Sequence, residues 1–152
     1  MHLVRRIDQE IERQSLLKHP FYKMWSEGKL DIEALQGYAK EYFHLVKAVP
    51  NIVEKISAQS SDDGIVTNLQ EEREHIEPWV KFANALGVSG QKLEQHDIAQ
   101  KTRDSVKILL DLASRFDEGI AAMYAYESEI PKISRTKLEG LAKYYKIGRA
   151  HV

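Results

Sequence analysis

The amino-acid sequence predicts an all-α fold, and three observations support that prediction. Apolar residues recur at the three- and four-residue spacing of helices along most of the chain. Alternating runs bounded by tight-turn dipeptides, the usual sign of strands, are not found. Only four prolines and eight glycines interrupt the 152 residues. A helical bundle whose apolar stripes face inward fits this pattern, and the length suits a single domain.

The first helix is expected from about residue 3 to 17. It ends before Pro20, which biases His19 away from helical geometry. A second helix has Asp31 in the N-cap position, and Pro50 is expected to kink it. Its predicted core stripe consists of Leu35, Tyr38, Tyr42, Leu45 and Val49.

A third helix is expected from about 65 to 86, because Gly87 is a residue type that favours helix C-termini. A further helical stretch continues to about Ser128, with a break expected near Asp117. Pro131 then begins or kinks a last helix.

Composition and charge exclude several classes of function. The formal net charge is −1, which gives no electrostatic footprint for nucleic acid or an acidic membrane. The absence of cysteine excludes disulfides and thiol nucleophiles. No apolar run is long enough to span a bilayer, and the N-terminus is too charged for a signal peptide. A cytoplasmic protein without nucleic-acid or membrane partners is expected.

The charged stretch NLQEEREHIEPW contains one acid that helical phase turns inward. In the seam of the third helix, spacings of four and three residues place Glu72 where every other member is apolar. His75 lies one turn along, on the flank of that seam, and the other charged residues point towards solvent. A buried carboxylate is costly unless it is paired, hydrogen-bonded or bound to a metal. The seam consists of Ile65, Leu69, Glu72, Ile76, Trp79, Ala83 and Leu86.

A second seam gives a second inward acid. Glu127, in YAYESEIP, occupies an otherwise apolar slot, whereas Glu129 does not. The inference assumes that helical phase continues unbroken across Asp117. This seam consists of Ala113, Phe116, Ile120, Met123, Glu127 and Ile130.

Two inward carboxylates and an imidazole at Glu-x-x-His spacing are the parts of a carboxylate-bridged metal site in a helical bundle. Oxygen and nitrogen ligands without thiolate suit iron or manganese. We therefore predict Glu72, His75 and Glu127 as metal ligands. The alternative is that each buried acid pairs with an arginine or lysine.

Three segments carry a family resemblance: LLKHPFYKMWSEGKLDIEALQGYAKEYFHLVKAVPNIV, NLQEEREHIEPWVKFANALGV and MYAYESEIPKISRTKLEGLAKYY. They resemble the haem-oxygenase-like TENA/THI-4/PQQC superfamily, and within it the dimetal branch that forms para-aminobenzoate. The resemblance implies an oxygen-dependent non-haem dimetal oxidase or oxygenase of cofactor biosynthesis, for example on the folate-precursor branch. Two iron or manganese ions would be its cofactors and dioxygen its co-substrate. The Glu-to-His spacing here is shorter than in that branch and is similar to that of other dimetal oxidases of the superfamily.

The resemblance also implies two residues with a direct part in the reaction. Tyr22, in HPFY, and Lys137, after YESEIP, match positions implicated as self-sacrificed precursors, so the substrate is a small molecule or is derived from the chain itself. Two alternatives remain: a metal-free TENA/PQQC-like protein, and a non-enzymatic interaction bundle whose buried acids are merely paired. Thiaminase-like members need a cysteine nucleophile, which this chain lacks.

The C-terminal residues depart from the family pattern. Family members continue past GLAKYY into further helices, so the remaining ligands are expected on a missing C-terminal segment. Residues 1–146 are expected to form a single helical domain, the N-terminal part of the family fold. Residues 147–152 are expected to be a non-native tail, since IGRAHV resembles a translated sequencing adapter. An incomplete bundle would expose apolar seams and favour association, for example as a homodimer.

Overall fold

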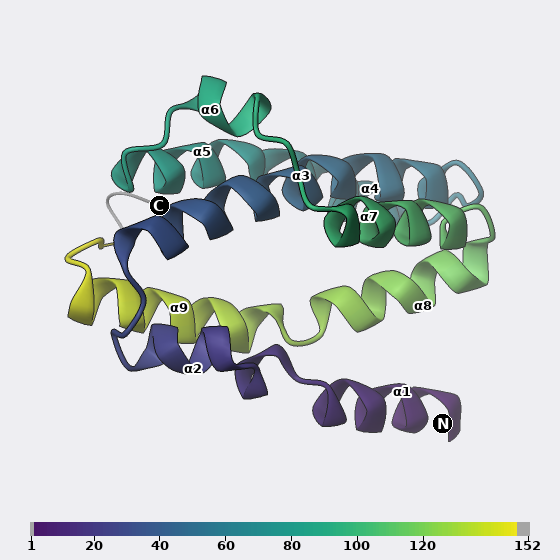
Figure 1. Cartoon of the computed structure of the whole chain (residues 1–152). Helices are drawn as coiled ribbons and strands as arrows, with labels where there is room; N and C mark the ends of the chain where they lie inside the picture. The colour runs from purple at the N-terminus through teal and green to yellow at the C-terminus, as the bar shows by residue number, and fades with distance from the viewer. Residues whose placement is uncertain (1, 149–152) are drawn as a thin grey trace. The chain divides into compact units, whose positions relative to one another are not determined.

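The computed structural model describes residues 2–148, and in this part of the chain all the regular structure is helical, with no strand (Figure 1). The all-α prediction is confirmed. The elements are α1 (His2–Arg13), the 3-10 helix η1 (Leu16–Lys18), α2 (Pro20–Ser26), α3 (Ile32–Ser57), α4 (Asp63–Glu74), α5 (Ile76–Ala85), α6 (Gly90–Glu94), α7 (Gln100–Leu112), α8 (Phe116–Glu127) and α9 (Ile130–Tyr144).

The described chain divides into two compact units. The first contains residues 2–31 and 123–148, and the second contains residues 32–122, so the boundary falls within α8. The single domain expected over residues 1–146 stays a prediction. Of the expected tail, residues 149–152 lie outside the described residues.

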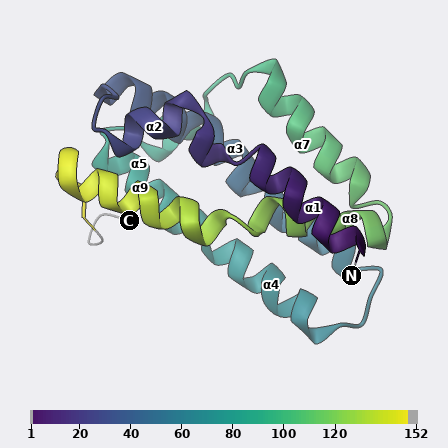
Figure 2. The same cartoon turned by 90° about the horizontal axis from the view of Figure 1, so that it is seen from below.

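In the first unit, α2 packs against α9 (Figure 2). The sequence predicts no separate helix at α2, which is too short for periodicity to show. Its start nevertheless follows from local chemistry. Pro20 occupies the first turn, where no N–H is needed, and the His19 side chain accepts a hydrogen bond from the N–H of Phe21. The first helix accordingly ends at Arg13, earlier than expected.

In the second unit, α3 is the central helix, and α4, α5, α6 and α7 pack against it. It begins directly after Asp31, as predicted, and continues through the buried Pro50 to Ser57. The predicted core stripe is only partly correct. Tyr38, Tyr42 and Leu45 are half-buried, and the fully buried stripe is rotated slightly around the helix from the predicted one. That stripe consists of Leu35, Ala39, Phe43, Val46, Val49, Pro50, Ile52, Val53 and Ile56.

Two of the predicted long helices are interrupted. The third expected helix is divided at His75 into α4 and α5, and it ends at the predicted place, with Gly87 at a φ of 81°. The later stretch breaks at residues 113–115, before the expected position near Asp117. No helix within residues 2–148 combines the length and the apolar character needed to cross a membrane.

Candidate metal site and reactive pair

Glu72 lies on the inward face of α4, as its place in the seam predicts. Its side chain is only 12% exposed, whereas its neighbours Glu71, Arg73 and Glu74 are exposed. Leu69, one turn earlier, is buried. Helical spacing alone therefore selected the least exposed acid from a cluster of charged residues.

His75 does not face the core as expected. The imidazole is 61% exposed, because α4 ends at Glu74 and α5 begins at Ile76, so the helical phase is interrupted at this residue. The ring nevertheless remains beside the buried acid. The Nδ1 atom of His75 lies 3.2 Å from the Oε2 atom of Glu72.

The spacing of these two atoms suits a shared metal ion. Two donors that are each about 2.1 Å from one ion, at a right angle, lie about 3 Å from each other. The Glu72 and His75 donors, at 3.2 Å, are close to that separation. They could thus supply one carboxylate and one imidazole, a ligand chemistry that suits iron or manganese. Within residues 2–148, however, no three His, Asp or Glu side chains are grouped closely enough to form a complete donor set.

Glu127 is the last residue of α8 and is half-buried, with its Oε1 atom inaccessible to solvent. The seam that predicted it is wrong in part: Met123 is buried, but Ile120, on the same helix α8, is exposed. Glu127 belongs to the first unit and Glu72 to the second. Whether the two acids serve one metal site stays a prediction.

Tyr22 and Lys137 lie in the same unit, on the packed helices α2 and α9. Tyr22 is buried, and the indole N–H of Trp25, one turn later on α2, donates to the main-chain carbonyl of Lys137 at 3.1 Å. Lys137 shares its stripe of α9 with the buried Ile133 and Leu141. It is therefore not the solvated helix residue that its sequence context, SRTKLEG, would ordinarily suggest.

The environment of Lys137 changes its acid–base chemistry. Desolvation by burial disfavours the charged ammonium and lowers the pKa of Lys137 to about 8. A measurable fraction of its amine is then unprotonated near neutral pH. An unprotonated amine has a lone pair and can act as a nucleophile or nitrogen donor.

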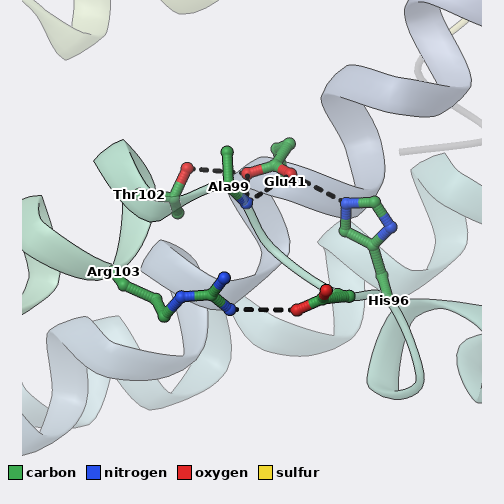
Figure 3. Close-up of polar contacts among 6 residues, drawn as sticks. Glu41, His96, Ala99, Thr102 and Arg103 are labelled. Atoms are coloured by element: carbon green, nitrogen blue, oxygen red, sulfur yellow. Dashed lines mark hydrogen bonds and ion pairs between the residues drawn. The ribbon is translucent and has the colours of Figure 1, made fainter.

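A further polar cluster, centred on Glu41 of α3, is absent from the sequence predictions (Figure 3). The Glu41 carboxylate accepts hydrogen bonds from the Thr102 hydroxyl at 2.6 Å and the Ala99 N–H at 3.1 Å, and it lies 2.8 Å from Nε2 of His96. Burial alone would raise the pKa of Glu41, but the hydrogen bonds from Thr102, His96 and Ala99 outweigh it and hold the pKa below its ordinary value. Glu41 thus caps the N-terminus of α7.

The opposite end of α7 is also held by α3. Lys55 donates to the main-chain carbonyl of Leu110 at 3.1 Å, and Gln59 donates to that of Ala113 at 2.8 Å. An acid at the N-terminus of a helix and a base at its C-terminus both complement the helix dipole. The Glu41 cluster is therefore accounted for as a structural attachment of α7.

An all-α chain with a long central helix and a largely buried Glu72 beside His75 has the features of the haem-oxygenase-like helical bundles. A family model described as the TENA/THI-4/PQQC family matches residues 7–147. The chain belongs to that family.

Three similar proteins are named 4-aminobenzoate synthase. The protein of Chlamydia pneumoniae is 36% identical over 95% of this chain and 69% of its own length. The protein of Chlamydia muridarum is 34% identical, with 95% and 66% covered, and that of Nitrosomonas europaea is 34% identical, with 93% and 65% covered. The chain spans about two thirds of the length of these relatives.

Proposed function

We propose that this chain provides the core of an oxygen-dependent, non-haem dimetal oxidase that forms 4-aminobenzoate or a related cofactor precursor. The names of the relatives support the product, and one observation on this chain supports the metal. Glu72 is 12% exposed, and His75 is the one side chain found to contact its carboxylate within residues 2–148. The carboxylate therefore has acceptor capacity beyond His75, which either water or a cation would satisfy.

Glu72 and His75 would supply two of the donors to one ion, and Glu127 would contribute a further carboxylate. Two iron or manganese ions, when bound, would supply the activation of dioxygen. The exposed edge of His75 leaves the pair open to an incoming ion. The neutral form of the imidazole is the form that binds a metal.

Tyr22 and Lys137 would be the source of a substrate derived from the chain. The product 4-aminobenzoate consists of an aromatic ring, a carboxylate carbon and an amine nitrogen. A tyrosine side chain contains the ring and one attached carbon, and a lysine contains the amine. Forming the product would break the Cα–Cβ bond of Tyr22 and the Cε–N bond of Lys137, and nitrogen would replace the phenolic oxygen on the ring. Oxidation of the freed Cβ to a carboxylate requires an oxidant, for which dioxygen is the proposed co-substrate. The lowered pKa of Lys137 favours the neutral amine that nitrogen transfer needs.

The proposal is tested by loading the chain anaerobically with Fe²⁺ or Mn²⁺ and then admitting air. We expect 4-aminobenzoate by chromatography, together with mass changes in the peptides that contain Tyr22 and Lys137. Glu72→Ala and Glu127→Ala should abolish both signals. Glu71→Ala, at the exposed neighbouring acid, should preserve them. Product formation that persists in Glu72→Ala would contradict the proposal.

A metal-free protein of the same family is the second candidate. An ion pair between His75 and Glu72, one turn apart on a helix, would explain their contact without a metal. In that case the chain would bind no Fe²⁺ or Mn²⁺ in the loading step. The remaining choice would be between a metal-free TENA/PQQC-like protein and a non-enzymatic interaction bundle.

A further inference from the structure

Trp25 of α2 is 1% exposed and contacts α9. Its indole N–H donates to the main-chain carbonyl of Lys137 rather than to a side chain. A main-chain acceptor fixes the position of the helical turn itself. The turn of α9 that carries Lys137 is therefore tied to α2 independently of the rotamer of the lysine.

Gly140, one turn after Lys137, makes this approach possible. A Cβ atom at Gly140 would lie 2.7 Å from Cδ1 and 3.1 Å from the carbonyl oxygen of Trp25. Glycine within a helix costs about 1 kcal/mol relative to alanine, and no positive φ requires it at this position. Close packing against Trp25 is the physical reason for a glycine here.

Contacts further along show that the two helices run in the same direction. Gly28, which follows α2, approaches the ring of Tyr144, and both main-chain groups of Leu30 bond to the hydroxyl of Tyr145. The residue numbers of the contacting pairs thus increase together along both segments. Trp25 contacts the turn of α9 from Lys137 to Gly140. Tyr22 lies one turn before Trp25 on α2. Because the helices run in the same direction, Tyr22 corresponds to the preceding turn of α9, which ends at Lys137.

We infer that Trp25 and Gly140 are positioning residues, which together fix the register of α2 against α9 and so hold Tyr22 beside Lys137. Phe21 supports the same arrangement, because its ring meets those of Tyr22 and Trp25 edge-on, with centroids 5.5 and 5.9 Å away. The inference rests on the proposed function in one respect, namely that Tyr22 and Lys137 react together.

The register is tested by cross-linking, which the absence of cysteine makes free of background. The parent is the double variant Tyr22→Cys/Lys137→Cys, treated with a short thiol-to-thiol reagent. We expect efficient intramolecular cross-linking in the parent. Adding Trp25→Phe, which keeps an aromatic ring but removes the donor, should lower the yield by about fivefold or more, because small misplacements strongly slow reactions between held groups.

Gly140→Ala should have the same effect, and Gly37→Ala is its matched control. Gly37 also lies within a helix, but a Cβ atom there would meet nothing within 4 Å. The control should cross-link like the parent. If Gly140→Ala fails to fold, as circular dichroism would report, Trp25→Phe alone decides. A parent that does not cross-link, or yields unchanged in Trp25→Phe, would overturn the inference.

A second readout uses the native Tyr22 and Lys137. The rate of Lys137 acetylation is followed by mass spectrometry against pH, with the exposed Lys132 as internal reference. Trp25→Phe should raise the pH midpoint of Lys137 by about one unit or more, towards that of an ordinary lysine. A midpoint that does not move would contradict the positioning role.

These measurements need neither metal nor dioxygen, so they separate the two proposals. Cross-linking as expected, without formation of 4-aminobenzoate by the loaded chain, would reject the proposed function and keep the register. The opposite result would reject the register alone.

Discussion

Glu41 and Glu72 are both partly buried carboxylates of the second unit, but they differ in how fully they are satisfied. Glu41 is 33% exposed and is contacted by Thr102, Ala99 and His96. Glu72 is 12% exposed and is contacted by His75, at 3.2 Å, within the described residues. The more buried acid thus has fewer partners.

That difference separates a structural acid from a candidate ligand. A carboxylate saturated by hydrogen bonds is stable as an anion and holds its donors in place, as Glu41 does at the start of α7. A more deeply buried carboxylate with spare lone pairs still needs water or a cation to complete its surroundings. Burial alone therefore does not identify a metal ligand, whereas burial with incomplete hydrogen bonding makes Glu72 the candidate of the two.

The largest effect expected from this comparison is on metal affinity. Glu72→Gln should weaken Fe²⁺ or Mn²⁺ binding by about 100-fold or more, since it removes a charged ligand. Glu41→Gln, an equal change at the saturated acid, should leave the affinity nearly unchanged. Anaerobic titration monitored by calorimetry measures both. Equal losses of metal affinity in the two variants would contradict the distinction drawn between Glu72 and Glu41.

The same two variants should have opposite effects on the stability of the metal-free chain. Glu41→Gln should lower the free energy of unfolding by about 1–2 kcal/mol, because charged hydrogen bonds to the start of α7 are lost. Glu72→Gln should be neutral or slightly stabilising, because it removes a buried charge. Urea unfolding followed by circular dichroism measures the difference. A large destabilisation by Glu72→Gln would assign that acid a structural role instead.

The stabilisation by Glu41 should depend on pH in a defined direction. Its folded-state pKa is lowered from the ordinary 4.5, so its contribution is complete above pH 4.5 and is lost as pH falls through the folded value. The stability gap between wild type and Glu41→Gln should therefore be constant near neutral pH and close in acid. Unfolding curves at several pH values measure it. A gap that widened on acidification would contradict the hydrogen-bonding scheme.

The smallest effect is expected at the edge of the Glu41 cluster. The ion pair between Arg103 and Asp97, at 3.0 Å, is solvent-exposed. Exposed pairs of this kind contribute about 0–1 kcal/mol. Arg103→Ala should therefore change stability much less than Glu41→Gln does. A comparable loss of stability in Arg103→Ala would mean that the exposed ion pair contributes as much to the cluster as the hydrogen-bonded Glu41 carboxylate does.

Much of the fold, and the inward placement of one candidate ligand, could be predicted from the sequence. Helical periodicity gave the fold class and the end of a helix at Gly87, and it selected Glu72 from a run of charged residues. These features depend on local spacing, which a sequence displays directly. The HPFY segment also indicated Tyr22, through family resemblance rather than through periodicity.

The features that could not be predicted depend on contacts between distant parts of the chain. The break at His75 interrupts a pattern that continues on both sides of it, so periodicity did not reveal the exposed imidazole. His96 was unremarkable as a loop residue until Glu41, 55 positions away, provided its partner. His44, whose Nε2 atom is buried without a hydrogen-bond partner in the described part of the chain, had no signal beyond its position off the predicted stripe. Such pairings follow from tertiary packing, which spacing alone does not encode.

The most direct test of the central claim is an anomalous-scattering map from crystals of this chain soaked in Mn²⁺. We predict a peak about 2.2 Å from a carboxylate oxygen of Glu72, with the His75 imidazole as a second ligand. A well-occupied peak elsewhere, for example at the Glu41 cluster, with none at Glu72, would contradict the assignment of Glu72 as a metal ligand.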